Sequence, residues 1–272
     1  MSNLIKGKAT ICIVNYKTLD FTRLCLRSIR KFTKYPYEVI VVDNDSQDES
    51  LEYLKSLSWI RLIERRAGVD EPGGGYAHAA GLDLGMENCS TEFFVSMHSD
   101  TLVLKNNWLR DLIYYFDNDE RIVCVGSGKI ELTPKWRLLL KRATDLRTFK
   151  RKVLREPDPA GKFRNYNRTI CSLYRTDILH RERLSFNMDR DMGLSCGQKL
   201  YFELVDHGYK TIELPSSIMN RYIIHLAHVT QVFNPGEFTV RKRTQRKCMR
   251  LVDKVMSLVI IQDILADNTL DK

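Results

Sequence analysis

The chain has 272 residues, of which 43% are hydrophobic, and its formal net charge is +9. This length suits one large domain or two small ones, because domains usually run to about 100–200 residues, and an excess of positive charge favours anionic partners. No stretch approaches the roughly 18 uninterrupted apolar residues of a membrane-spanning helix, and the first residues lack the layout of a signal peptide, so we expect a cytoplasmic protein.

Short apolar runs alternate with helical patterns through the first hundred residues. Runs rich in β-branched residues predict buried strands, and apolar residues at helical spacing predict helices. The resulting β-α-β-α-β-α-β order indicates a parallel sheet covered by helices. The expected strands are Ala9–Asn15, Tyr37–Val42, Trp59–Glu64 and Phe93–Met97, and the expected helices are Asp20–Phe32, Glu49–Leu57 and Ala77–Asn88.

The pattern loosens after residue 100 but remains α/β. We expect helices at 108–116, 175–180 and 198–207, strands at 122–126, 169–174 and 209–214, and a basic segment at 135–155. The absence of a linker predicts one continuous α/β domain over residues 1–235, followed by a helical C-terminal extension over residues 236–272. Seven scattered cysteines without a CxxC pair indicate buried free thiols rather than a zinc site or a disulfide framework.

Polar clusters follow three of the expected strands. They are Asn15-Tyr16, Asp43-Asn44-Asp45 and His98-Ser99-Asp100. In parallel sheets ligands bind outside the carboxyl ends of the strands, so these clusters predict one shared site. The third cluster interrupts the apolar stretch "FFVSMHSDTLVL", and a plain turn between two strands is the alternative explanation for it.

Two stretches resemble glycosyltransferase family 2, whose members have the GT-A fold. They are "ICIVNYKTLDFTRLCLRSI" with "YEVIVVDNDSQDES", and "GGGYAHAAGLDLGMENCSTEFFVSMHSDTLVL". The resemblance is close over residues 9–104. It implies a GT-A domain with a Rossmann-like, mostly parallel sheet. It also implies an inverting, metal-dependent hexosyltransferase that uses a nucleotide-diphosphate sugar, most often a UDP-sugar. The acceptor would be a glycan, a lipid-linked molecule or a protein. Polysaccharide biosynthesis is one process in which such a transfer would take part.

The resemblance also assigns roles to the polar clusters. Asn15 and Tyr16 would line the base pocket, Asp43 and Asp45 would accept hydrogen bonds from the base or the ribose, and Ser99 would belong to the same nucleotide-binding set. The backbone at Gly74 and Gly75 would approach the donor closely; an ordinary flexible loop is the alternative for this glycine run.

The metal site implied by the family centres on Asp100, the last acid of its DXD motif. Its hard oxygen ligand suits Mn²⁺ or Mg²⁺. His98 replaces the first acid of the motif, where it could ligate the metal or hydrogen-bond the ribose or a phosphate. The family often adds a histidine after the last core strand, for which we choose His228 first and His225 second; for each of the three histidines a structural role is the alternative.

The usual "ED.DL" element that carries the catalytic base is missing from this sequence. Counting back from Gly208-Tyr209, its place is taken by residues 195–200, which contain no carboxylate. We choose Asp191 as the base, because it precedes a Met-Gly turn, and Asp189 as the second choice; an exposed loop is the alternative for both. A non-catalytic nucleotide-sugar-binding relative is therefore a competing hypothesis.

Three further hypotheses concern the basic residues at 241–250 and the C-terminal segment that contains them. A nucleic-acid-binding protein would use them, but no aromatic residues are interleaved and no known nucleic-acid module is present. The C-terminal segment could instead pack against the domain or a partner in a homodimer, which is the commoner use of such a stripe. Basic residues beside an apolar stripe also fit a peripheral contact with a membrane.

Overall fold

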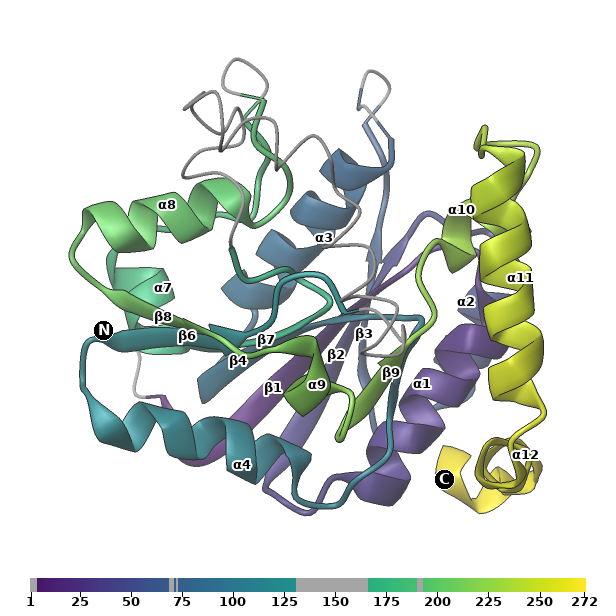
Figure 1. Ribbon diagram of the computed structural model, residues 1–272, viewed down its shortest axis with the longest axis horizontal. Coiled ribbons are helices and arrows are strands. Elements are labelled where there is room, and N and C mark those ends of the chain that lie inside the picture. The colour runs from purple at the N-terminus through teal and green to yellow at the C-terminus, as the bar shows by residue number, and fades with distance from the viewer. Residues whose placement is uncertain (1–3, 69–70, 72, 131–165, 190–192) are drawn as a thin grey trace, which may run out of the picture.

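The computed structural model describes residues 4–68, 71, 73–130, 166–189 and 193–272, and its centre is a seven-stranded sheet (Figure 1). The strand order is β3-β2-β1-β4-β7-β6-β8. The strands are β1 (Ile5–Asn15), β2 (Tyr37–Asn44), β3 (Arg61–Arg65), β4 (Thr91–His98), β6 (Ile122–Gly126), β7 (Cys171–Arg175) and β8 (Lys210–Glu213). All seven expected strands are therefore confirmed, with shifts of a few residues at their ends.

The sheet is mostly parallel, as the sequence predicted. Strands β3, β2, β1 and β4 run in one direction, and β8 runs parallel to β6. Strand β7 is antiparallel to both of its neighbours, β4 and β6. The carboxyl ends of β1, β2 and β4 consequently meet at one edge of the sheet.

Helices bury both faces of the sheet, which explains the nearly continuous apolar runs of its strands. In β1, Ile11 and Ile13 face one helical layer, while Cys12 and Val14 face the other. The first layer contains α1 (Leu19–Phe32), α2 (Glu49–Ser56), α4 (Trp108–Ile113) and the 3-10 helix η1 (Tyr114–Asn118). The second contains α3 (Gly75–Glu87), α7 (Thr176–Arg181) and α8 (Gln198–Asp206).

A second, two-stranded sheet lies next to the central one and was not predicted. Strand β5 (Thr101–Val103) follows β4 after a tight turn and pairs antiparallel with β9 (Ile223–His225). The short helices α9 (Ser216–Met219) and α10 (Val229–Phe233) precede and follow β9. This pairing connects residues 101–103 to residues 223–225, which are more than a hundred positions further along the chain.

The C-terminal helices pack on the outer side of α1, at the right of Figure 1. They are α11 (Lys242–Met256), α12 (Val259–Ala266) and the 3-10 helix η3 (Asn268–Asp271). Their apolar side chains join Phe21 and Leu24 of α1 in a separate hydrophobic cluster that includes Cys248, Val252 and Ile261. Within the described ranges, no helix has both the length and the apolar character needed to cross a membrane.

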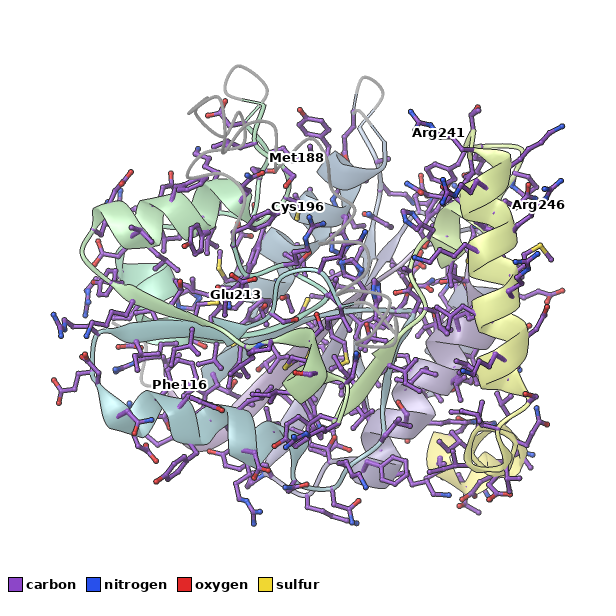
Figure 2. All side chains as sticks on the ribbon, viewed as in Figure 1. Phe116, Met188, Cys196, Glu213, Arg241 and Arg246 are labelled. Carbon is purple, nitrogen blue, oxygen red and sulfur yellow. The ribbon has the colours of Figure 1, made fainter. Side chains whose placement is uncertain are left out.

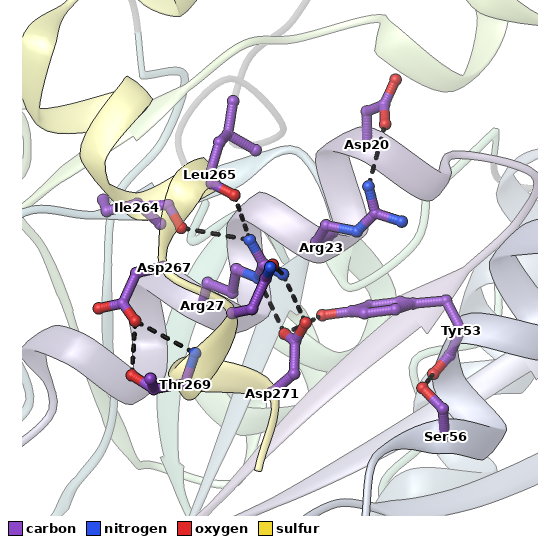
Figure 3. Close-up of polar contacts among 11 residues, drawn as sticks. Asp20, Arg23, Arg27, Tyr53, Ser56, Ile264, Leu265, Asp267, Thr269 and Asp271 are labelled. Carbon is purple, nitrogen blue, oxygen red and sulfur yellow. Dashed lines mark hydrogen bonds and ion pairs between the residues drawn. The ribbon is translucent and has the colours of Figure 1, made fainter.

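A buried arginine holds the end of the chain against α1 (Figure 3). The Arg27 side chain is only 4% exposed, and its Nε donates to Asp271 Oδ1 over 2.8 Å. The same guanidinium donates to Asn268 Oδ1 at 2.7 Å and to the backbone carbonyls of Ile264 and Leu265. Tyr53 of α2 donates to the same carboxylate over 2.8 Å. Helices α1 and α2 thus share one ionic contact with residues 264–271.

All seven cysteines are free, and six are buried. Burial raises the pKa of the Cys171 thiol to about 12 and that of Cys248 to about 11, so both remain protonated. This agrees with the sequence prediction of structural thiols. Cys12 of β1 packs directly against Gly85 of α3, where an added Cβ would lie 2.2 Å from the Cys12 sulfur. Because Gly85 has no side chain, α3 can approach β1 closely at this point.

Candidate functional site

Three potential metal ligands meet beside the carboxyl end of β4. One ligand atom from each of His98, Asp100 and His225 lies within 4.8 Å of the other two. His98 ends β4, and Asp100 lies in the turn that leads into β5. His225 reaches them because β9 pairs with β5, where its Cα is opposite Thr101. The β5–β9 pairing therefore assembles the cluster from two distant parts of the chain.

The cluster contains buried polar atoms that the protein itself does not satisfy. His225 Nε2 lies 3.2 Å from Asp100 Oδ1, and His98 Nδ1 lies 3.9 Å from the same oxygen. Even so, neither Asp100 Oδ1 nor His225 Nδ1 has a partner in hydrogen-bond geometry. An unsatisfied buried polar atom normally costs stability, so a pair of them in one cluster indicates a place for a ligand.

The charges in the cluster suit a cation. Burial opposes ionisation of Asp100, but the nearby His225 and His98 hold the pKa of its carboxyl below the ordinary value. Burial lowers the pKa of His98 well below that of a free histidine, and the neighbouring His78 lowers it further. Near neutral pH the cluster therefore offers a carboxylate and an uncharged imidazole, which are the protonation states that bind metals.

Two residues that the sequence analysis missed orient His98. Its Nε2 lies 3.2 Å from Thr169 Oγ1, and His78 Nε2 lies 3.5 Å from the same hydroxyl. The His78 ring also stacks edge-on against His98 at 4.8 Å between centroids, and burial lowers its pKa to about 4. Because Thr169 engages Nε2, the Nδ1 atom of His98 remains to face Asp100.

A chain of hydrogen bonds joins the ends of β1, β2 and β4. Asn15 pairs in register with Asp43, and Val14 pairs with His98. Asn15 Nδ2 donates to Asp43 Oδ1 at 2.7 Å, while its Oδ1 lies 3.5 Å from Thr18 Oγ1. That hydroxyl lies 3.4 Å from Ser99 Oγ. Asp43 and the turn containing Ser99 and Asp100 therefore share one edge of the sheet, as the sequence predicted.

Asn15 and Asp43 are buried and use their polar atoms inside the protein. Asn15 is 0% exposed and Asp43 is 1% exposed. The Asn15 amide also donates to Ser46 and Ser50, and Asp43 accepts from the backbone N–H and the hydroxyl of Ser46. Their first effect is thus to fix the ends of the two strands.

Tyr16 and Asp45 lie nearer the surface and have partners there. The Tyr16 hydroxyl donates to Glu237, which also forms an ion pair with Lys17. Asp45 has a positive φ of 64° and lies 3.1 Å from an Arg66 nitrogen. A hydrogen bond from Gln47 and the charge of Arg66 lower the pKa of the Asp45 carboxyl.

The glycine run leads directly into α3. Gly74 has a φ of 68°, which a residue with a side chain rarely adopts. A Cβ at Gly75 would lie 2.8 Å from Met188 Sδ, so the segment before Asp189 touches the start of this helix (Figure 2 labels Met188). Asp189 forms a β-bridge with Leu194. Asp191, the first choice of catalytic base, lies outside the described residues, as does the basic segment 135–155.

His225, the second choice from the sequence, joins the cluster, whereas His228 does not belong to the three-residue group. His228 is exposed, has a positive φ of 65°, and its Nδ1 lies 3.1 Å from Gln231 Oε1. Strand β9 ends at His225, so His228 lies outside it. Only His225 is therefore positioned by the pairing of β9 with β5.

Comparisons with known proteins agree with this architecture. The sequence model described as "Glycosyl transferase family 2" matches residues 10–180. No curated protein matches the sequence. The mannosyltransferase PcManGT from Pyrobaculum calidifontis, solved with GDP-Man and Mn²⁺, superposes with a TM-score of 0.51 at 17% identity, covering 76% of this chain and 54% of that one. This chain thus spans about half of that protein's length.

Two structures of a second protein are also similar in shape. S. aureus TarS 1-349 gives a TM-score of 0.48 at 13% identity and covers 93% of this chain and 72% of its own. The same fragment in complex with UDP-GlcNAc gives 0.49 at 14% identity, with coverage of 95% and 70%.

Proposed function

The chain belongs to glycosyltransferase family 2 and has the GT-A fold, and we propose that it transfers a sugar from a nucleotide-diphosphate donor to a glycan, lipid-linked or protein acceptor. The observation that carries this proposal is the meeting of His98, Asp100 and His225 at the carboxyl edge of the sheet. Ligands bind at this edge in open α/β sheets, and the polar chain from Asp43 to Ser99 lies on the same edge.

The three residues of the cluster would hold a divalent cation. Two imidazole nitrogens and one carboxylate form a ligand set that fits Mn²⁺ better than Mg²⁺, since Mg²⁺ prefers an all-oxygen octahedral shell. When bound, such a cation neutralises the diphosphate and stabilises the departing nucleotide as a Lewis acid. The complex of the similar mannosyltransferase with GDP-Man and Mn²⁺ supports this choice.

The donor would lie along the edge that begins at Tyr16. We assign its base and ribose to Tyr16 and Asp45, and its diphosphate to the region of Ser99 and the backbone at Gly74 and Gly75. Asn15 and Asp43 would support this surface by holding the ends of β1 and β2 in place. A UDP-sugar is our first choice of donor and a GDP-sugar the second.

The acceptor would approach from the segment that follows Met188, because the Met188 side chain touches the glycine run at Gly75. A carboxylate there would remove the acceptor proton as the hydroxyl attacks the sugar, giving inversion at the anomeric carbon. Asp191 is our first candidate for this base and Asp189 the second. Each should be replaced by Asn, and loss of turnover with unchanged donor affinity would identify the base.

The deciding experiment measures thermal unfolding with UDP-sugars and GDP-sugars, each with and without Mn²⁺. A donor that binds only the folded protein raises the unfolding temperature, and at a concentration of about 100 Kd it adds about 2.7 kcal/mol. We expect this shift only with Mn²⁺ present, and we expect Asp100→Asn to abolish it. Equal shifts for Asp100→Asn and the unchanged protein would contradict the site.

The missing "ED.DL" carboxylates favour one competing proposal, a family member that binds nucleotide sugars without transferring them. Slow metal-dependent hydrolysis of the donor without acceptor separates the two proposals. We expect free sugar and nucleotide diphosphate to accumulate with the unchanged protein. Tight donor binding without hydrolysis, and without turnover on any acceptor, would support the non-catalytic relative instead.

A further inference from the structure

Helix α11 presents a strongly basic face to solvent. Six cationic side chains lie on it, and we call them the basic face: Lys242, Arg243, Arg246, Lys247, Arg250 and Lys254. At about 100° per residue, they occupy an arc of roughly 140° on the helix. The opposite side carries Cys248, Val252 and Val255, which are buried against the body of the protein.

One acid lies within the arc of the basic face: Asp253 is at about 20° from Lys242, so the six cations keep a large excess of positive charge in the part of the chain that the structure describes. Asp253 is the one acid in α11, and all six cations are exposed without a recorded ion pair. Five of them line a shallow hollow: Lys242, Arg243, Arg246, Lys247 and Arg250. In Figure 2, Arg246 projects from α11 away from the rest of the molecule. Such a hollow is suited to phosphate groups.

Exposed apolar residues follow the basic face directly in the chain. Leu258, Val259 and Ile260 form the junction between α11 and α12, and their exposed fractions are 38%, 76% and 39%. Lys254 stands only four residues before Leu258. A basic helical face beside solvent-exposed aliphatic residues is the combination found in segments that lie on membrane surfaces, where cations meet headgroups and apolar residues enter the acyl boundary.

We propose that the basic face of α11 and the Leu258–Ile260 segment dock the protein on a bilayer containing anionic lipids. The charge complementarity comes from six cations against phosphate headgroups, within the range of four to eight basic residues typical of such sites. A nucleic acid would match the charge but not the exposed aliphatic residues. This surface is separate from the histidine cluster, and the inference does not depend on the proposed sugar transfer.

The test is flotation of the full chain with vesicles of phosphatidylcholine alone or with 30 mol% phosphatidylglycerol. We expect binding only to the anionic vesicles, and we expect it to weaken as salt is raised because salt screens surface charges. Removing two cations in Arg246→Gln/Arg250→Gln should lower the partition coefficient about 30-fold, since each basic residue near such a surface contributes about a fivefold factor. Val259→Asn should also weaken binding without changing its salt dependence.

A matched control removes two exposed cations elsewhere. Lys105 lies just before α4 and Arg110 lies within it. In Figure 1, α4 is at the lower left of the molecule and α11 is at the right. Lys105→Gln/Arg110→Gln changes the net charge equally and should float like the unchanged protein. If both double variants lose the same amount of vesicle binding, net charge alone explains the binding, and the proposal is overturned. Binding to single-stranded RNA but not to anionic vesicles would overturn it in favour of nucleic acid.

Discussion

His225 Nε2 lies 3.2 Å from Asp100 Oδ1, and the two side chains are both buried although they come from opposite halves of the sequence. The pairing of β5 with β9 enforces this proximity, since the Cα of His225 is opposite that of Thr101. His228, three residues later, is exposed and directed elsewhere. The chain therefore provides two neighbouring histidines with very different relations to the same carboxylate.

This contrast gives a matched pair of variants for the metal site. We expect His225→Ala to lower Mn²⁺ affinity by at least about tenfold, because it removes one of three ligands. His228→Ala should leave the affinity unchanged. Isothermal titration with Mn²⁺ alone measures both effects, and thermal unfolding without metal checks that each variant is folded. The cluster is not a metal site if the two variants bind Mn²⁺ equally well.

Thr169 provides a second test that leaves every ligand in place. Its hydroxyl lies within 3.5 Å of both His98 Nε2 and His78 Nε2. Thr169→Val keeps the shape of the side chain but removes the hydroxyl, and we expect Mn²⁺ affinity to fall about 10-fold to 100-fold, as when other supports of metal ligands are lost. Thr169→Ser retains the hydroxyl and should restore most of the affinity. A purely structural threonine would give two variants with the same metal affinity.

We expect loss of the hydrogen bond between Asn15 and Asp43 to lower the stability of the protein. Asn15→Ala leaves a buried carboxylate without one of its donors, which costs about 1–3 kcal/mol of unfolding free energy. Gln47→Ala removes an exposed hydrogen bond to Asp45 from the same turn and should change stability by less than about 0.5 kcal/mol. Urea unfolding of the two variants compares them directly; equal midpoints would show that the buried bond contributes little.

Arg27 should contribute far more to stability than its neighbour Arg23 on α1. Removing one partner of a buried ion pair typically costs about 3–5 kcal/mol, so Arg27→Ala should destabilise the protein strongly. Arg23 makes a loose pair with Asp20 at 3.7 Å and a cation–π contact with the Tyr53 ring at 5.0 Å. Each such contact near the surface contributes no more than about 1 kcal/mol, so Arg23→Ala should cost at most about 2 kcal/mol. Thermal unfolding distinguishes the two variants. Similar losses of stability would mean that the contact between Arg27 and Asp271 in Figure 3 is not a strong one.

The sequence predicted the sheet well because its strands carry a strong local signal. The runs at 9–15 and 37–42 are apolar and rich in β-branched residues, the run at 93–97 is apolar and aromatic, and each is bounded by polar residues. The antiparallel direction of β7 was not predicted, because residues 171–175 have the same apolar character whichever way the strand runs. Direction depends on where the connecting chain returns, and local composition does not encode it.

The site shows the same division between local and distant information. The convergence of Asp43 and Asp100 followed from two strand ends in a parallel sheet, and the sequence was sufficient for it. The choice between His225 and His228 required the β5–β9 pairing, which joins segments of three residues each and has no clear sequence signal. His78 and Thr169 carried no motif, so only their positions in space identified them.

The contact between Arg27 and Asp271 joins residues 244 positions apart. On the ribosome, α1 is therefore complete long before its partner has been synthesised. Until residues 264–271 arrive, the nascent chain would expose Phe21 and Leu24 together with an uncompensated guanidinium, and contacts this distant in sequence form slowly. Newly made protein should consequently depend on chaperones during synthesis, even if the finished molecule is stable.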